Sequence, residues 1–130
     1  MEILLDTHIF LWYITGDRHL PTTILELIRD PANEVYLSPV SLWEVIVKYH
    51  LGKLPLPQSP AAYIPLQRQR HQIRSLPLDE GSVTKLSLLP MLHKDPFDRM
   101  LICQAIHHSL MLASTDDAIH NYSAQVLLIP

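Results

Sequence analysis

The sequence is poor in cysteine, in net positive charge and in long apolar runs, and each shortage excludes a class of protein. The single cysteine, Cys103, excludes an internal disulfide and a cysteine-based metal site, and its apolar helical surroundings predict a small buried side chain. With 10 Lys and Arg against 13 Asp and Glu, the net charge is −3, so any polyanion must be bound locally. Because no apolar run approaches the roughly 20 residues that cross a bilayer, and the N-terminus lacks a secretory leader, we expect a cytoplasmic protein.

The length and the apolar content predict one domain over residues 1–130. Of the 130 residues, 48% are apolar, which is enough to bury a core. Short apolar runs that favour strands occur at 2–6, 34–38, 72–76, 110–115 and 125–130. Because helical segments separate these runs, we predict an α/β fold, a three-layer α/β/α sandwich with a central, mostly parallel sheet of about five strands.

Several helix boundaries can be read from capping residues. Ser38 followed by a proline predicts the start of a helix that Gly52 ends. Asp79 can cap the segment that follows it, and Asp95 can cap a helix starting at the next proline. Prolines around and within residues 61–71 predict an irregular helix there.

Four acidic residues fall where parallel sheets place their ligand-binding groups. In a βαβ unit, the carboxyl end of each strand and the start of the next helix lie at the same edge of the sheet. Asp6 ends the first predicted strand and Asp116 follows the fourth. Glu44 lies about one and a half turns into the helix after the second strand, and Asp98 lies in the first turn of the helix before the fourth. We therefore expect four carboxylates to meet at one edge.

Each of these acids also has an ordinary structural explanation. Asp6 could cap a short helix over residues 7–13, and Asp98 could take part in a capping arrangement. Glu44 has the spacing of a surface ion pair with Lys48, and Asp116 could lie in a turn. The functional interpretation is favoured because all four would otherwise have to reach the ligand-binding edge by coincidence.

Four carboxylates in one pocket require a positive counter-charge. Two like charges about 4 Å apart repel by roughly 4 kcal/mol at an effective dielectric constant near ~20. A ligand set of oxygens alone favours Mg²⁺, with Mn²⁺ as a substitute, over zinc. Such an ion polarises a phosphoryl oxygen and activates a water molecule, so phosphate chemistry there needs no serine, cysteine or histidine nucleophile.

Four motifs then identify a family resemblance. They are "LLDTHIFLW", "SPVSLWEV", "LPMLHKDPFDRMLICQA" and "LASTDDAIHNY", and in this order they span essentially the whole chain. With them the chain resembles PIN-domain ribonucleases, specifically the VapC-type toxins of bacterial toxin–antitoxin pairs. The resemblance implies metal-dependent hydrolysis of RNA, with Asp6, Glu44, Asp98 and Asp116 as catalytic, metal-binding acids. It also implies a homodimer, and inhibition by a small antitoxin whose C-terminal segment covers the catalytic groove.

Neighbours of the four acids have two possible roles each. We interpret Asp95 as a helix cap and Asp117 as a turn residue. Thr7 and Ser114 could hydrogen-bond to a carboxylate or to a metal-bound water, or could be caps. Arg99 could clamp a phosphate or pair with a nearby acid.

Histidines, arginines and aromatic residues outside the quartet have mainly structural interpretations. His8 and His93 lie in the matched motifs, where a structural hydrogen bond is favoured over substrate contact. The adjacent His107 and His108 are expected on the surface, on different faces of their helix. A basic cluster could be a solvated face or could guide RNA; it consists of Arg68, Arg70 and Arg74. Three aromatic residues are expected to pack in the core or in a dimer; these are Trp12, Trp43 and Tyr49.

Other functions remain as alternatives. A haloacid-dehalogenase-like phosphohydrolase also has a first strand ending in aspartate, but it requires a second acid two residues later, where this chain has His8. A phosphoacceptor receiver domain requires an N-terminal acid pair and a lysine late in the sequence, and this chain lacks both. A catalytically inactive PIN-like module that binds RNA or protein is a non-enzymatic alternative, and DNA is an alternative substrate because the acids contact the phosphate rather than the 2′-hydroxyl.

Overall fold

A central parallel sheet organises the chain. The computed structural model describes residues 1–129. Four strands, β1 (Glu2–Leu5), β2 (Glu34–Leu37), β3 (Arg74–Ser75) and β4 (Met111–Ala113), form the sheet in the order β3-β2-β1-β4. All three pairings are parallel. The predicted α/β class and parallel sheet are therefore confirmed.

The expected fifth strand at 125–130 is reduced to a single parallel bridge within the described residues. Leu112 pairs with Leu128 there, through two backbone hydrogen bonds. The start of this segment closes a turn instead, since the backbone N–H groups of Gln125 and Val126 both donate to the carbonyl oxygen of Tyr122. Those two donors are therefore not free to extend a sheet ladder.

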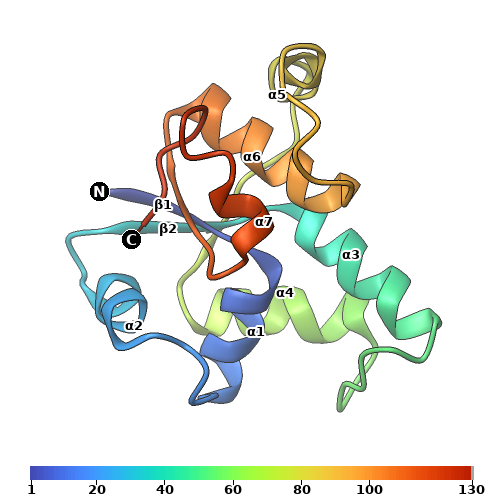
Figure 1. Cartoon of the computed structure of the whole chain (residues 1–130). Coiled ribbons are helices and arrows are strands. Elements are labelled where there is room, and N and C mark those ends of the chain that lie inside the picture. The colour runs from blue at the N-terminus through green and yellow to red at the C-terminus, as the bar shows by residue number, and fades with distance from the viewer. Residues whose placement is uncertain (130) are drawn as a thin grey trace.

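Helices cover both faces of the sheet (Figure 1). They are α1 (Thr7–Thr15), α2 (Thr22–Arg29), α3 (Pro39–His50), α4 (Pro60–Arg70), α5 (Glu80–Thr84), α6 (Pro96–His108) and α7 (Asp117–His120), with a short 3₁₀ turn, η1 (Lys85–Ser87), after α5. In Figure 1, α5 and α6 lie on one side of the strands, and α1, α2 and α4 lie on the other. The three-layer prediction is thus correct.

The alternation of side chains along β1 explains these two layers. Ile3, Leu4 and Leu5 are all fully buried. Ile3 and Leu5 belong to the core under α1, α2 and α4, whereas Leu4 belongs to the core under α6 and α7. Because successive residues of a strand point to opposite faces, a continuous apolar run requires cover on both.

Local capping signals set most helix starts as predicted. Ser38 Oγ accepts from the backbone N–H of Val40, and Asp95 Oδ1 accepts from that of Phe97. Asp79 likewise caps α5. After α3, Gly52 has a φ of 71°, a left-handed conformation that favours glycine.

Two helices differ from the sequence analysis. The segment expected to be irregular forms a continuous helix, α4, with Pro65 inside it. Proline removes one backbone hydrogen bond near the start of this helix, but the carbonyl of exposed Ala61 can instead accept from water. The boundary signals did not reveal α2, which begins after Pro21 without a side-chain cap.

The apolar side of α6 is as expected. Leu101, Ile102 and Ala105 are buried, as is Cys103, and Phe97 is half-buried. This helix therefore has a firmly packed inner face and carries the predicted Asp98 in its first turn. Among the described residues, no helix combines the length and apolar character required to cross a bilayer.

Candidate active site at the carboxyl ends of the strands

Asp6 and Asp116 lie at the carboxyl ends of the neighbouring strands β1 and β4. Each also caps a helix: Asp6 Oδ1 accepts from the N–H of Ile9, and Asp116 Oδ1 accepts from that of Ala118, both at 2.8 Å. Ser114 lies between the two acids, since its hydroxyl accepts from the N–H of Asp116 at 3.0 Å and its proximity lowers the pKa of Asp6. Asp6 and Asp116 therefore each cap a helix and also lie at the edge of the sheet where ligands bind.

Burial is the main reason that the pKa of Asp6 is raised. Its side chain is enclosed, and the negative charge of Asp116 adds to the effect. The proximity of Ser114, the hydrogen bond from Ile9 and the nearby His8 oppose the shift without cancelling it. An ionised Asp6 thus lacks sufficient positive compensation from the protein alone.

Glu44 is buried beside Thr7 instead of forming a surface ion pair. Its side chain is only about 2% exposed. Glu44 Oε1 lies 2.6 Å from Thr7 Oγ1, which in turn lies 2.9 Å from Ser41 Oγ. Lys48 Nζ contacts Glu44 Oε2, so the i, i+4 pair exists, but its acidic member is internal. The predicted hydrogen bond from Thr7 to a carboxylate is confirmed.

Lys48 is a charged neighbour of the site whose importance the sequence analysis underestimated. Burial disfavours its ammonium, but Glu44, Asp95 and Asp98 outweigh that effect and raise the pKa of Lys48. The lysine therefore stays protonated and supplies part of the counter-charge. Its spacing from Glu44 was the available signal.

The pKa of Asp98 shows the effect of the neighbouring carboxylates most clearly. Burial is the first cause that raises its pKa to about 6, and the charges of Asp95, Glu44 and Asp6 raise it further. A 2.8 Å contact between His93 Nε2 and Asp98 Oδ2 opposes the shift. Acids from three separate chain segments are thus close enough to destabilise the ionised form of Asp98.

Three donor groups converge closely enough to share one ion. His93, Asp98 and Asp116 each offer a ligand atom, and these atoms lie within 4.8 Å of one another. Asp116 is exposed, so an ion can approach from solvent. The raised pKa values of Asp6 and Asp98 mean that a cation would relieve an existing electrostatic cost, and the oxygen-rich donors suit Mg²⁺ or Mn²⁺. The residues present therefore fit a hard divalent ion.

The four predicted acids are not equivalent in this geometry. Asp98 and Asp116 belong to the close donor group, and Ser114 lies between Asp6 and Asp116. Glu44 lies near enough to raise the pKa of Asp98, but Thr7 and Lys48 already contact its two carboxylate oxygens. His93, which the sequence analysis treated mainly as a structural residue, offers the third close donor.

Arg99 has neither of its expected roles. It is buried, and its Nη1 donates to the carbonyl oxygen of Pro90 and to the hydroxyl of Tyr122, both at 2.9 Å. The side chain leaves α6 toward the protein interior, where it anchors the segment before the helix. It is therefore unavailable to a phosphate or an acid. Asp117 is exposed and begins α7 instead of lying in a turn.

Of the two packing roles expected for Trp43, the core role is wrong, and packing in a dimer stays a prediction. Its side chain is 58% exposed and meets Phe97 edge to face, with ring centroids 4.9 Å apart. Trp12 is half-buried against the core, as expected, and Tyr49 is also half-buried. A helix pattern indicates which residues share a side but not whether another element covers that side.

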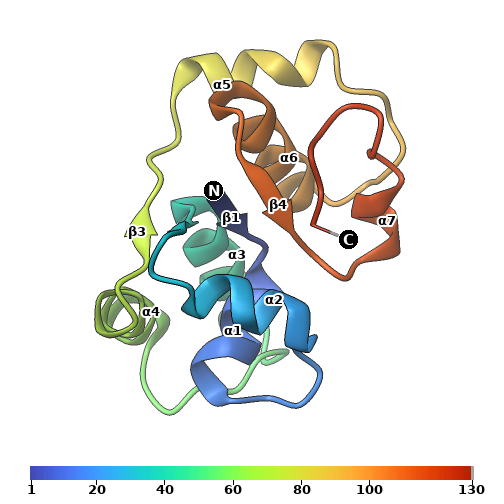
Figure 2. The ribbon, with the colours of Figure 1, turned by 90° about the vertical axis from the view of Figure 1, so that its left-hand side faces the viewer.

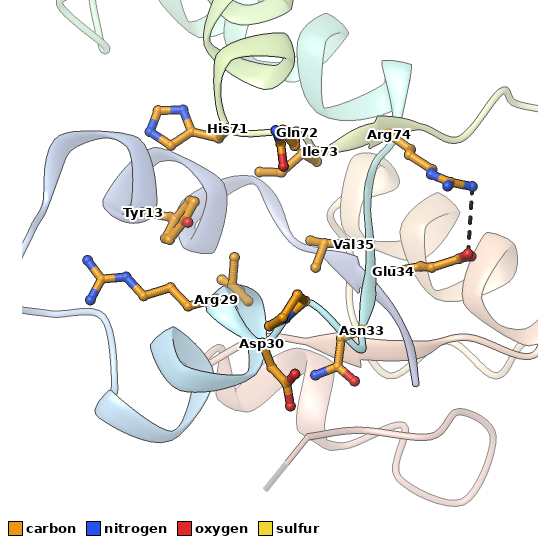
Figure 3. Close-up of a pocket in the computed structure, with 12 residues that line it drawn as sticks. Tyr13, Arg29, Asp30, Asn33, Glu34, Val35, His71, Gln72, Ile73 and Arg74 are labelled. Carbon is orange, nitrogen blue, oxygen red and sulfur yellow. Dashed lines mark ion pairs between the residues drawn. The ribbon is translucent and has the colours of Figure 1, made fainter.

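A large cavity lies away from the acids. It measures about 570 Å³ and is lined by residues preceding β2 and β3, at the amino ends of these strands (Figure 3). There Arg74 points toward Glu34, 3.7 Å away, which accounts for one member of the basic cluster (Figure 3). Ligands of parallel sheets bind at the opposite edge, so size alone does not identify the active site.

Known proteins share both the fold and part of the sequence. A family model described as PIN domain matches residues 3–125. Over 55 residues the chain is 38% identical to Ribonuclease VapC16 of Mycobacterium tuberculosis, a match that covers 42% of this chain and 39% of that protein. The chain thus spans well under half the length of this relative.

Solved structures agree over almost the entire chain. VapBC2 from Rickettsia felis, bound to a DNA fragment from its promoter, superposes with a TM-score of 0.72 at 14% identity, covering 99% of this chain and 98% of that chain. A toxin–antitoxin complex from Klebsiella pneumoniae gives a TM-score of 0.63 at 16% identity, covering 98% and 96%. These similarities extend the shared fold from β1 to the last described turn. Since the family match reaches across nearly all of the sequence and the sheet has the same architecture, the chain belongs to the PIN domain family.

Proposed function

We propose that this protein is a metal-dependent ribonuclease toxin that a cognate antitoxin neutralises. Asp6, Asp98, Asp116 and Glu44 are the proposed metal-binding and catalytic acids, with Mg²⁺ as the ion and Mn²⁺ as its substitute. The observation that carries the proposal is the convergence of His93, Asp98 and Asp116 within 4.8 Å, beside buried Asp6 and Glu44. RNA as the substrate is supported by the partial identity to a protein named as a ribonuclease.

The residues of the chain have distinct tasks in the proposed reaction. When bound, the divalent ion would polarise a phosphoryl oxygen and lower the pKa of a water molecule, which becomes the nucleophile. The backbone N–H of Ile9 orients Asp6, Thr7 orients Glu44, and Asp95 holds the start of α6 so that Asp98 faces the other acids. These fixed hydrogen bonds preorganise carboxylates that would otherwise repel one another.

A cleavage assay with paired variants tests the proposal. Total RNA is incubated with the protein in Mg²⁺ or Mn²⁺, and again with EDTA. Asp98→Asn and Asp6→Asn keep the shape of each side chain but remove its charge, and should reduce cleavage on the order of 10²-fold or more. Asp30→Asn is the matched control, since Asp30 is exposed at the opposite edge of the sheet. Cleavage that survives EDTA or both active-site substitutions contradicts the proposal.

The main alternative is a PIN-like module that binds RNA without cutting it. The contact of Lys48 with Glu44 favours this alternative, because it neutralises one of the four acids within the protein. Single-stranded DNA of matched sequence in the same assay separates RNA from DNA as the substrate. RNA binding without detectable cleavage in either metal would select the non-catalytic alternative.

The proposed partners rest on the family resemblance and on the described relatives. One structural neighbour is described as a toxin–antitoxin complex, which supports an antitoxin partner. A short reading frame directly upstream should encode a protein that suppresses cleavage when mixed in equal amounts. The resemblance also implies a homodimer, which sedimentation of the purified protein would detect as twice the chain mass.

A further inference from the structure

A second cluster of metal-binding side chains lies at the other end of α6. His107 and His108 are the last two residues of this helix, and Asp79 caps α5. His108 Nε2 is 2.7 Å from Asp79 Oδ2, and His107 Nε2 is 4.0 Å from Asp79 Oδ1. One ligand atom from each of the three residues lies within 4.8 Å of the others.

The two histidines lie on the surface side of α6, as expected, but both reach one carboxylate although they were expected on different faces of the helix. Adjacent residues diverge by about 100° around a helix axis. Here α5 lies beside the end of α6 that leads into β4 (Figure 2), and both rings reach the same carboxylate. The two imidazole rings meet edge to face, with centroids 4.9 Å apart. Only the packing of α5 against α6 makes this possible.

The cluster is separate from the candidate active site. Asp98 lies in the first turn of α6, and His107 follows nine residues later, a distance of about 14 Å along the axis. One ion cannot bridge the two clusters. The second cluster also combines two imidazoles with one carboxylate, a softer donor set than the acids around Asp98.

The Asp79 carboxylate is fixed in position and favours its ionised form, as an anionic metal ligand requires. Its Oδ1 accepts from the backbone N–H of Ser82 at 2.8 Å, which fixes the side chain as a helix cap. The proximity of Ser82, whose backbone N–H donates to the carboxylate, is the first cause that lowers the pKa of Asp79 to about 2, and His108 contributes further. The side chain is partly exposed, so an ion can reach it.

His108 Nε2 is close to this carboxylate but is not properly hydrogen-bonded. The atom is shielded from solvent and has no aligned hydrogen-bond partner among the described residues, despite the 2.7 Å separation from Asp79. An imidazole nitrogen without an aligned partner is costly when shielded from water. A cation between the two groups would satisfy both.

Gly81 provides the space that His107 occupies. A Cβ atom at Gly81 would lie 2.4 Å from both Cε1 and Nε2 of His107, so the ring packs directly on the glycine backbone. Gly81 lies inside α5, where glycine costs up to about 1 kcal/mol relative to alanine. Glycine at this position thus gives up some helix stability but allows His107 to approach Asp79.

We propose that Asp79, His107 and His108 form a second metal site, for Zn²⁺ or a similar imidazole-binding transition metal. Zinc bonds to such ligands at about 2.0–2.2 Å, which in tetrahedral geometry separates the donors by about 3.3 Å. His108 Nε2 lies 2.7 Å from Asp79 Oδ2 and His107 Nε2 lies 4.0 Å from Asp79 Oδ1, one shorter and one longer than this value. Water completes the coordination, and the ion ties the start of α5 to the end of α6.

Zinc titration calorimetry and thermal melts at pH 7.5 test this site without any measurement of RNA cleavage. The background protein carries Asp98→Asn and Asp116→Asn, which disable the first cluster and leave the second intact. It should bind one Zn²⁺ per chain and melt at a higher temperature when zinc is present. His107→Gln, His108→Gln or Asp79→Asn should each lower the affinity by more than the ~10-fold that loss of an outer-shell partner costs.

Two further variants separate metal binding from folding. Gly81→Ala keeps all three donors and favours the helix, so it should not lower the melting temperature without zinc, yet it should weaken zinc binding by displacing His107. His50→Gln alters an exposed histidine elsewhere and should have no effect. The proposal is overturned if the background protein binds no zinc, or if its binding is unchanged by His107→Gln, His108→Gln and Gly81→Ala. Either outcome leaves the proposed nuclease untouched.

Discussion

Replacing Asp98 by asparagine should stabilise the metal-free protein while abolishing its proposed activity. The pKa of this carboxyl group rises from 3.8 to about 6 on folding, chiefly through burial. At about 1.4 kcal/mol per pKa unit, the ionised side chain costs roughly 3 kcal/mol in the folded state. Because Asp98 is only 13% exposed, solvent screens little of this cost. Asp98→Asn removes the charge, so above pH 7 we expect a gain of about 1–3 kcal/mol in the free energy of unfolding.

The pH dependence has a definite sign. A carboxyl group whose folded pKa is raised contributes stability that is fully present below 3.8 and is lost as the pH rises through about 6. The free energy of unfolding of the wild-type protein in EDTA should therefore include a fall of up to about 3 kcal/mol between about pH 4 and 7. That component should be missing in Asp98→Asn.

Urea denaturation in EDTA at intervals from pH 4 to 7.5 measures both proteins. Parallel stability profiles, or a less stable variant above pH 7, would show that burial and neighbouring carboxylates do not destabilise ionised Asp98. Repeating the series in Mg²⁺ provides an internal check. An ion at 100 times its dissociation constant stabilises the wild type by about 2.7 kcal/mol, and the variant should gain much less.

Three other substitutions test buried polar groups by urea denaturation. Thr7→Val should cost about 1–3 kcal/mol, because it removes the hydroxyl at 2.6 Å from Glu44, and Thr7→Ser should recover most of the loss. Lys48→Met should cost a similar ~1–3 kcal/mol in EDTA, since Glu44 then has no cationic partner, and the loss should shrink in Mg²⁺ if the ion takes over that role. Tyr122→Phe should cost about 1–3 kcal/mol by removing a hydrogen-bond partner of buried Arg99; a neutral result would refute the anchoring role of that pair.

Local sequence signals were sufficient for much of the secondary structure. Ser38, Asp79 and Asp95 cap helices as predicted, because the hydrogen bonds of a cap span only two or three residues. The continuous apolar run around Leu4 predicted a strand covered on both faces, because a strand alternates its side chains between them. Helix α2, which has no side-chain cap, had no comparable signal.

The order of strands and acids predicted that Asp6, Glu44, Asp98 and Asp116 would approach one edge of the sheet. Parallel connectivity alone brings strand ends and helix starts together. The sequence did not determine which polar side chains at this edge pair with one another. Whether Lys48 neutralises Glu44, or whether His93 meets Asp98, depends on distances between packed elements.

Tertiary packing also decided the environment of several individual side chains. Trp43 remains exposed although its ring meets Phe97 of α6, and Arg99 turns inward, where Tyr122 and the carbonyl of Pro90 accept from it. His107 meets Asp79 only because α5 packs across the end of α6. Thus the sequence alone determined most of the elements and the edge where the acids gather, through contacts between near neighbours and strand connectivity. Which charges are paired, buried or exposed was decided by the tertiary structure, since burial and electrostatic interaction depend on groups that are distant in the chain and close in space.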